Sequence, residues 1–170
     1  MKAEFEKVYR EQRDAVYGYL LYMTGDEQMT QDLVQETFLK IYLNLHRFRQ
    51  ESSMKTWCIA IAKNTYLSYL KKKRPETVEE KFGFQVADGK PLPEEKIILE
   101  EKNNLIRQVL FSMKEDERQL LLLRDYEKLS YKEIGELIGV SEIVVKGRIY
   151  RAREHYKKKY RQMADKWEAE

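Results

Sequence analysis

Cysteine and histidine are scarce in this sequence of 170 residues. Its one cysteine, Cys58, excludes an internal disulfide framework, and the apolar neighbours of Cys58 favour a packing role over a reactive thiol. The two histidines, His46 and His155, lie far apart in the sequence, which shows no metal-ligand cluster, Gly-rich phosphate loop or nucleophile motif. These absences argue against an enzyme, and we expect no metal, no cofactor and no small-molecule substrate.

Long apolar runs are also missing. No stretch approaches the roughly 20 apolar residues of a membrane-spanning helix, and the polar N-terminus does not resemble a signal peptide. Together with the single cysteine, this predicts a soluble cytoplasmic protein. Although 36% of the residues are charged, the net charge is only +3. The local distribution of charge therefore matters more than the total.

Proline is confined to one short segment. All three prolines and two of the seven glycines lie within residues 75–94, where acidic residues also outnumber basic ones. On both sides of this segment, apolar residues recur at helical intervals. The sequence therefore predicts an all-α protein with two small helical domains, residues 1–74 and 95–170, joined by a flexible acidic linker over residues 75–94.

The helix predicted for residues 30–45 has an unusual polar face. Val34, Phe38 and Ile41 mark its apolar, core-facing side. The opposite side combines acids, an amide and leucines: Asp32, Gln35, Glu36, Leu39 and Leu43. Such a face suits a basic partner surface with an apolar centre. Exposed leucines are also common on ordinary surfaces, so the pattern alone leaves both interpretations open.

The next helix is predicted to follow a polar loop at residues 49–55, to be capped by Thr56 and to cover about residues 57–73. It closes with four consecutive cations at residues 71–74. A basic end can merely complement the helix dipole. Four adjacent cations repel one another, however, and they suit phosphates better, with nearby aromatic rings available to stack on unpaired bases. The pattern therefore favours nucleic acid as a partner.

Residues 130–154 follow the pattern of a helix-turn-helix. Ser130 and Glu133 form a capping box, Gly139 stands where a tight turn needs an unhindered backbone, and Ser141 can cap a second helix. Residues 141–163 hold eight lysines and arginines but only two acids. A helical hairpin in an unrelated bundle would also show caps and a glycine. It would not need this charge, which is the electrostatic signature of a DNA-binding face.

Three of these segments together resemble a known family. DLVQETFLKIYLNLHRF at residues 32–48, followed by TWCIAIAKN at residues 56–64, is similar to domain 2 of the extracytoplasmic-function sigma factors of bacteria. SYKEIGELIGVSEIVVKGRIYRARE at residues 130–154 is similar to their domain 4. The resemblance covers nearly the whole chain, and the order and spacing of the motifs make it specific. It implies an RNA polymerase sigma factor that reads the −35 and −10 elements of a promoter and helps to open the duplex.

The resemblance also implies partners and the residues that meet them. Core RNA polymerase, through the clamp helices of its β′ subunit and through its β subunit, would bind Asp32, Gln35, Glu36, Leu39 and Leu43. Recognition and melting at −10 would involve Arg49, Ser52, Ser53, Lys55, Trp57, Asn64, Lys71, Lys72 and Arg74. The −35 element would contact Ser141, Ile143, Lys146, Gly147, Arg148, Tyr150 and Arg151. Double-stranded and single-stranded promoter DNA are thus expected partners, and so is an inhibitory anti-sigma factor, often membrane-bound in this family.

Three positions in the second helix of the motif depart from the family. Gly147 stands where serine is frequent, at a loss of about 1 kcal/mol in helix propensity. Our hypothesis is that the helix backbone approaches DNA closely at this point. Glu142 and Ile143 are bulkier and more acidic than the small residues often found there, which leaves the −35 sequence preference open.

A different class of protein could also carry a helix-turn-helix. The alternative is a stand-alone transcriptional regulator that acts as a dimer without polymerase. Such a regulator would have no use for the acidic face at residues 32–43, nor for a second basic, aromatic helix. These two features favour the sigma factor.

Overall fold

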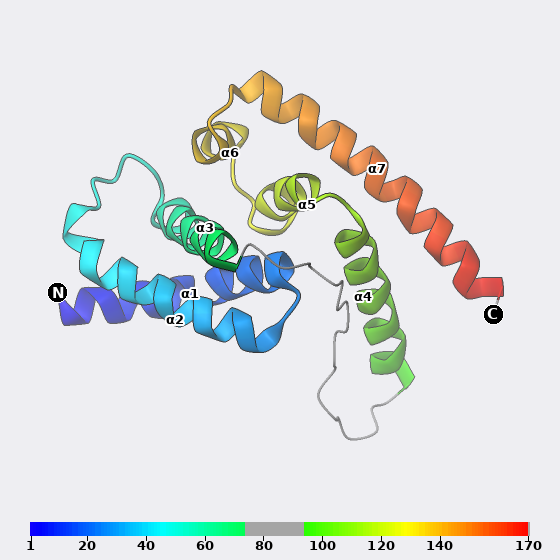
Figure 1. The fold of residues 1–170 in the computed structure, drawn as a ribbon, viewed down its shortest axis with the longest axis horizontal. Coiled ribbons are helices and arrows are strands. Elements are labelled where there is room, and N and C mark those ends of the chain that lie inside the picture. The colour runs from blue at the N-terminus through cyan, green and yellow to red at the C-terminus, as the bar shows by residue number, and fades with distance from the viewer. Residues whose placement is uncertain (74–93, 170) are drawn as a thin grey trace.

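The structure, a computed structural model, describes residues 1–73 and 94–169, with the backbone alone for residues 94–100 (Figure 1). Its elements are α1 (Lys2–Thr24), α2 (Glu27–Asn44), the 3-10 turn η1 (Leu45–Arg47), α3 (Met54–Lys73), α4 (Glu94–Ser112), α5 (Glu115–Leu121), the π-helical turn η2 (Leu122–Tyr126), α6 (Tyr131–Ile138) and α7 (Glu142–Ala169). No strand occurs among these described residues, which confirms the all-α prediction. Most of the predicted linker lies outside the described residues, as does Arg74.

Helices α1, α2 and α3 pack on one another around side chains that are fully buried, among them Val16, Leu20, Ile41 and Ile59. Cys58 belongs to this core, and burial raises the pKa of its thiol to about 12. The thiol therefore stays protonated near neutral pH, which confirms the packing role.

The connection between α1 and α2 is fixed by local chemistry. Gly25 ends α1 in the left-handed region at φ +68°, where a side chain would be strained. Asp26 then caps α2 by accepting a hydrogen bond from the Met29 amide at 2.9 Å. The helix thus begins before Thr30, the start predicted from sequence. The Thr30 hydroxyl is buried and donates to the Asp26 carbonyl at 2.6 Å.

Two other caps were predicted wrongly. Thr56 lies inside α3, because Ser53 accepts the Thr56 amide with its hydroxyl at 3.1 Å and so starts the helix earlier. The spacing of Ser112 and Glu115 suggests a cap for α5, but Ser112 ends α4 instead, since its hydroxyl donates back to the Val109 carbonyl at 2.7 Å. Serine can serve either end of a helix, so spacing alone did not separate these roles.

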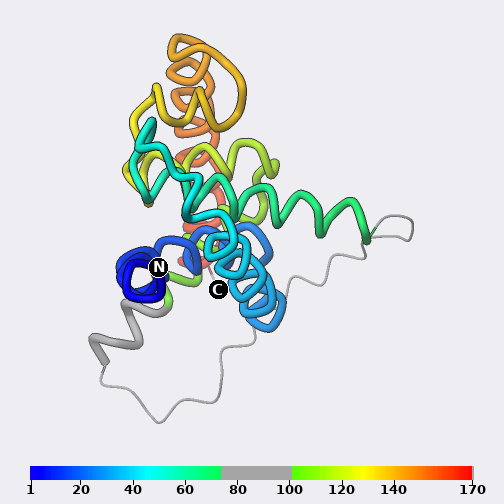
Figure 2. Tube along the Cα trace, turned by 90° about the vertical axis from the view of Figure 1, so that its left-hand side faces the viewer, coloured from blue at the N-terminus to red at the C-terminus, as the bar shows by residue number. Residues whose placement is uncertain are grey.

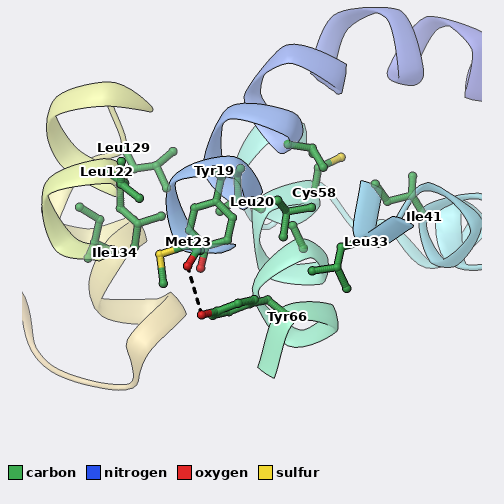
Figure 3. Packing of buried hydrophobic residues seen from close by; sticks show 14 of the residues in the cluster. Tyr19, Leu20, Met23, Leu33, Ile41, Cys58, Tyr66, Leu122, Leu129 and Ile134 are labelled. Carbon is green, nitrogen blue, oxygen red and sulfur yellow. Dashed lines mark hydrogen bonds between the residues drawn. The ribbon is translucent and has the colours of Figure 1, made fainter. Parts of the chain in front are cut away.

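The two halves of the chain share one apolar core. Leu122, Leu129 and Ile134 of the C-terminal half pack against the end of α1, as Figure 3 shows beside Tyr19 and Met23. Polar contacts accompany this packing: Arg118 Nη2 donates to the Met23 carbonyl at 3.3 Å, and Gln119 Nε2 donates to the Tyr19 hydroxyl at 2.8 Å. The sequence predicted two separate domains and gave no sign of this shared core.

Candidate protein and nucleic-acid interfaces

The outer face of α2 is open to solvent, as its sequence pattern predicts. Leu39 and Leu43 are each 58% exposed, while Phe38, on the other side of the helix, is 4% exposed and packs inward. Asp32, Gln35 and Glu36 are exposed beside the leucines. Glu36 Oε1 lies 2.8 Å from Lys40 Nζ, an i,i+4 ion pair that leaves the other acids available.

Aromatic residues that sequence analysis missed border this α2 face. Tyr42 and Tyr9 are 39% and 38% exposed, and they belong to a ring cluster that also includes Phe5 and Phe38. The ring centroids of Tyr9 and Phe38 lie 4.7 Å apart, and those of Phe5 and Tyr42 lie 5.1 Å apart. Because half of the cluster comes from α1, the pattern of α2 alone could not predict it.

A surface pocket of about 350 Å³ lies between the end of α2 and α3. Its lining combines cations, amides, an indole and an aliphatic side chain: Lys40, Asn44, Arg47, Trp57, Ile61 and Asn64. Trp57 and Asn64 were predicted as DNA contacts, and the structure brings them together. The other polar lining residues were missed, although Lys40, Asn44 and Arg47 follow a helical i, i+4, i+7 spacing that could have revealed them.

The remaining residues of the predicted −10 set are spread over a longer surface. Lys71 and Lys72 are exposed in the last turn of α3, beyond the pocket. Arg49 and Ser52 lie in the loop before α3, where Arg49 is exposed and Ser52 is half-buried. The family resemblance assigned all four to −10 binding, and no contact with the C-terminal half that the structure records covers them.

Ser53 and Lys55 contact the C-terminal half, although Ser53 is exposed and Lys55 is half-buried. Lys55 Nζ lies 3.2 Å from Glu127 Oε2 and donates to the Glu127 carbonyl oxygen at 2.6 Å. The Ser53 hydroxyl donates to Glu133 Oε2 at 3.4 Å, and Thr56 Oγ1 donates to the same oxygen. Figure 2 shows the start of α3 beside α6.

The pKa values of these two carboxylates are shifted in opposite directions. Burial raises the pKa of Glu127, although Lys55 acts to lower it. Burial also acts to raise the pKa of Glu133, but hydrogen bonds from Thr56, Ser130 and Ser53 outweigh it and hold the pKa below its ordinary value. The ionised form is therefore favoured at Glu133 and disfavoured at Glu127.

The helix-turn-helix forms as its sequence predicts. The Glu133 amide donates to Ser130 Oγ at 3.0 Å and the Ser130 amide donates to Glu133 Oε1 at 3.3 Å, which completes the capping box. Gly139 adopts φ +75° at the turn. At Gly135 an added Cβ would lie 2.6 Å from the Val140 carbonyl oxygen, so only glycine allows α6 and the turn to approach this closely.

The outer face of α7 presents the whole predicted −35 set. Ile143 and Tyr150 are 84% and 67% exposed, while Val145, Ile149 and Ala152 are buried on the opposite side. The polar members of the set, Ser141, Lys146, Arg148 and Arg151, are exposed as well. At Gly147 an added Cβ would meet only the Arg151 Nη1 atom, at an ordinary 3.8 Å, so packing within the chain does not require glycine there.

Within residues 1–73 and 94–169, histidine, cysteine, aspartate and glutamate side chains form no group of three or more that could hold a metal ion. None of the helices in that part of the chain combines the length and the apolar character needed to cross a membrane.

Comparison with known proteins separates the chain into two recognised regions. Residues 8–76 match Sigma-70 region 2, and residues 103–155 match Sigma-70, region 4. The first match contains α1–α3 and the second contains the helix-turn-helix. A stand-alone dimeric regulator is not favoured, because region 2 accounts for the acidic α2 face and for the basic helix α3.

Individual relatives extend the similarity to most of the chain. RNA polymerase sigma factor YlaC of Bacillus subtilis is 30% identical over 161 residues, covering 90% of each chain. The ECF RNA polymerase sigma factor SigW of the same organism is 30% identical, covering 89% of this chain and 86% of the relative. The sigma factor RpoE of Bartonella quintana, solved with the anti-sigma factor NepR, shares the fold with a TM-score of 0.72 at 19% identity, covering 93% of this chain and 97% of that one. The chain therefore belongs to the sigma-70 family, as an RNA polymerase sigma factor of the extracytoplasmic-function group.

Proposed function

We propose that this sigma factor docks on core RNA polymerase through the outer face of α2. The observation that supports this most directly is the pair of leucines, each 58% exposed, beside Asp32, Gln35 and Glu36. Exposed apolar side chains gathered with charges on one helix face are typical of a surface that a partner covers. Here the acids suit a basic partner surface, as the family's contact with the β′ clamp helices implies.

The −10 element is opened and held by the surface of α3. An unpaired base enters the pocket beside Trp57, where the indole offers a stacking surface and the amides of Asn44 and Asn64 offer donors and acceptors. Lys40 and Arg47 in the same pocket, with Lys71 and Lys72 beyond it, neutralise phosphates. This work requires binding alone, so the protein acts without a catalytic site of its own.

The −35 element is read by α7 in the major groove. Its exposed side combines Ile143, Lys146, Arg148, Tyr150 and Arg151, a mixture of apolar and cationic contacts to bases and phosphates. The β subunit would support this half of the chain on polymerase. The protein works in the cytoplasm, where polymerase acts, and an anti-sigma factor would inhibit it by covering these surfaces, since the sigma factor RpoE of the same fold is in complex with the anti-sigma factor NepR.

Co-purification with core RNA polymerase tests the proposal. The wild-type chain should bind purified core enzyme, and the double substitution Asp32→Ala with Glu36→Ala should weaken binding by about tenfold or more, because it removes two charges from the contact. Glu6→Ala with Glu11→Ala is the matched control, since it removes two exposed acids from α1. If the wild type fails to bind, or if both double variants behave alike, the proposed docking face is wrong.

A further inference from the structure

Ile143, in the first turn of α7, is 84% exposed, more than any other large apolar side chain that the structure describes. A single apolar residue on a surface is ordinary, but Ile143 has a neighbour of the same kind on the same helix face. Tyr150 is 67% exposed, and residues seven apart lie on one side of a helix. Figure 1 shows this part of α7 at the edge of the molecule, beside α6. The described chain thus leaves both apolar side chains uncovered.

Gly147 lies between these two residues on the same face. A helical side chain leans toward the N-terminus and covers the turn before it, so a side chain at 147 would lie over Ile143. Glycine leaves this space open, because an added Cβ would meet only Arg151 Nη1, at 3.8 Å. Ile143, Gly147 and Tyr150 therefore form an apolar strip on α7 that lacks a side chain at its middle position.

Cations flank the apolar strip. Lys146 and Arg151 are exposed on either side of it, and neither forms an ion pair with a described residue. Such a surface suits a polyanion that also offers apolar groups between its charges. The major groove of DNA has this composition, because phosphates border it on both sides and the edges of the bases form its floor. The charges around the strip therefore favour duplex DNA as its ligand.

Only one of the four bases offers an apolar group in the major groove. Guanine, adenine and cytosine present hydrogen-bond donors and acceptors there, whereas thymine adds a 5-methyl group to its O4 acceptor. The N-terminal residues of a recognition helix contact the base edges, and Ile143 is the second residue of α7. A polar base edge placed against Ile143 would lose water without gaining a hydrogen bond. Thymine is the base that avoids this loss.

We propose that Ile143 is a specificity-determining residue of the −35 contact, which selects thymine by packing its 5-methyl group against the apolar strip of α7. This inference rests on the proposed insertion of α7 into the major groove, and it names the base that the insertion favours. Gly147 takes part by leaving room for the methyl group beside Ile143. The close approach of DNA at Gly147 thereby acquires a defined ligand.

The first experiment identifies the element and then removes the methyl group. Core polymerase carrying the wild-type chain selects binding sites from a pool of random duplexes, and the enriched −35 element provides the probe. Each thymine of this probe, on either strand, is replaced in turn by deoxyuridine, which keeps the base pair and removes only the 5-methyl group. One replacement should weaken binding by about fourfold, the factor that burial of one such group contributes. Unchanged binding after every replacement overturns the inference.

Variants of the chain then connect the methyl group to Ile143. With Ile143→Ala, the thymine and deoxyuridine probes should bind equally well, whereas Ile143→Val keeps a branched apolar side chain and should keep the difference. Gly147→Ala places a Cβ beside Ile143 and should weaken binding of the thymine probe more than that of the deoxyuridine probe. Because Ile143 is exposed, Ile143→Ala should leave the melting temperature unchanged, which separates a loss of binding from a loss of folding.

Lys146→Ala is the matched control, because Lys146 is an exposed neighbour on α7 that ends in a charge. It should weaken binding of both probes by the same factor, as loss of a phosphate contact does. A fourfold difference between the probes that persists in Ile143→Ala overturns the inference, since another residue then reads the methyl group. If Lys146→Ala and Ile143→Ala both bind each probe as the wild type does, the proposed −35 role of α7 fails, and the inference fails with it.

Discussion

Two cationic surfaces of this sigma factor differ in whether they are free. The outer face of α7 is exposed from Ile143 to Arg151, except that Gly147 is half-buried. The beginning of α3 carries comparable chemistry, yet Ser53 and Lys55 are bonded to the carboxylates of Glu133 and Glu127. Both surfaces have a sequence pattern suited to DNA, but Lys55 on the second is already paired within the chain, with its side chain 35% exposed.

The difference arises from how each surface is built. The α7 face is stabilised by its own neighbours in sequence, through the Ser130 capping box, the Gly139 turn and the buried Val145. The α3 surface depends on which part of the chain packs beside it, and that part is more than 70 residues away in sequence. Local chemistry therefore builds the α7 face, whereas the surroundings of the α3 start depend on packing between distant segments.

Truncation of a side chain in the shared core should have the largest effect on stability. Leu123 is fully buried in the cluster that joins the two halves, so Leu123→Ala should lower the free energy of unfolding by roughly 3 kcal/mol through lost burial and a cavity. The loss should appear in both halves at once. Urea unfolding followed by tryptophan fluorescence can report the loss for each half separately, because Trp57 lies in α3 and Trp167 lies in α7.

Single-tryptophan variants separate the fluorescence signals of the two halves. Trp167→Phe leaves Trp57 as the reporter of the N-terminal half, and Trp57→Phe leaves Trp167 as the reporter of the C-terminal half. Both reporters should give the same midpoint before and after Leu123→Ala, as one cooperative unit requires. A midpoint that moves only for Trp167 would mean that the halves unfold independently and that their contact is weak.

The pH dependence of stability should sharpen the comparison between Glu127 and Glu133. Burial raises the pKa of Glu127 in the folded state. Its contribution to stability is therefore fully present below the pKa of the unfolded state, about 4.3, and is lost as pH rises through the pKa of the folded state. The net lowering of the Glu133 pKa, where hydrogen bonds from Thr56, Ser130 and Ser53 outweigh burial, gives the opposite behaviour: its contribution is present above about 4.3 and is lost as pH falls.

Glutamine substitutions separate these two contributions. Relative to wild type, Glu127→Gln should gain stability as pH rises from about 4 to about 7, whereas Glu133→Gln should lose stability as pH rises from about 3 to about 5. Urea titrations at several pH values measure both slopes, and Glu136→Gln supplies the baseline for loss of an exposed acid. Slopes of the same sign would contradict the assignment of opposite environments to the two carboxylates.

Sequence analysis succeeded where a feature is local. The capping box at Ser130, the left-handed Gly139 and the exposed leucines of α2 each follow from spacing within one or two helical turns. The start of α3 was predicted wrongly, because Ser53 and Thr56 both have the chemistry of a cap and only the backbone geometry selects Ser53.

The features that sequence analysis missed join distant segments. The aromatic border of the α2 face needs Tyr9 from α1. The shared core requires Leu122 and Ile134 to reach α1. The periodicity of a single sequence does not specify such pairings, since each residue fits its own helix pattern equally well in other arrangements of the helices.

Gly147 allows a small but informative test of the free surface. Replacement by alanine should raise the free energy of unfolding by up to about 1 kcal/mol, because helix propensity improves and the new Cβ meets only Arg151 Nη1 at 3.8 Å. Binding of the holoenzyme to a promoter should weaken at the same time if the α7 backbone approaches DNA at this point. Gln162→Ala, on the exposed later part of α7, should leave promoter binding unchanged. Since the chain itself has room for a side chain at 147, promoter binding by Gly147→Ala that equals or exceeds the wild type would remove close approach to DNA as the reason for this glycine.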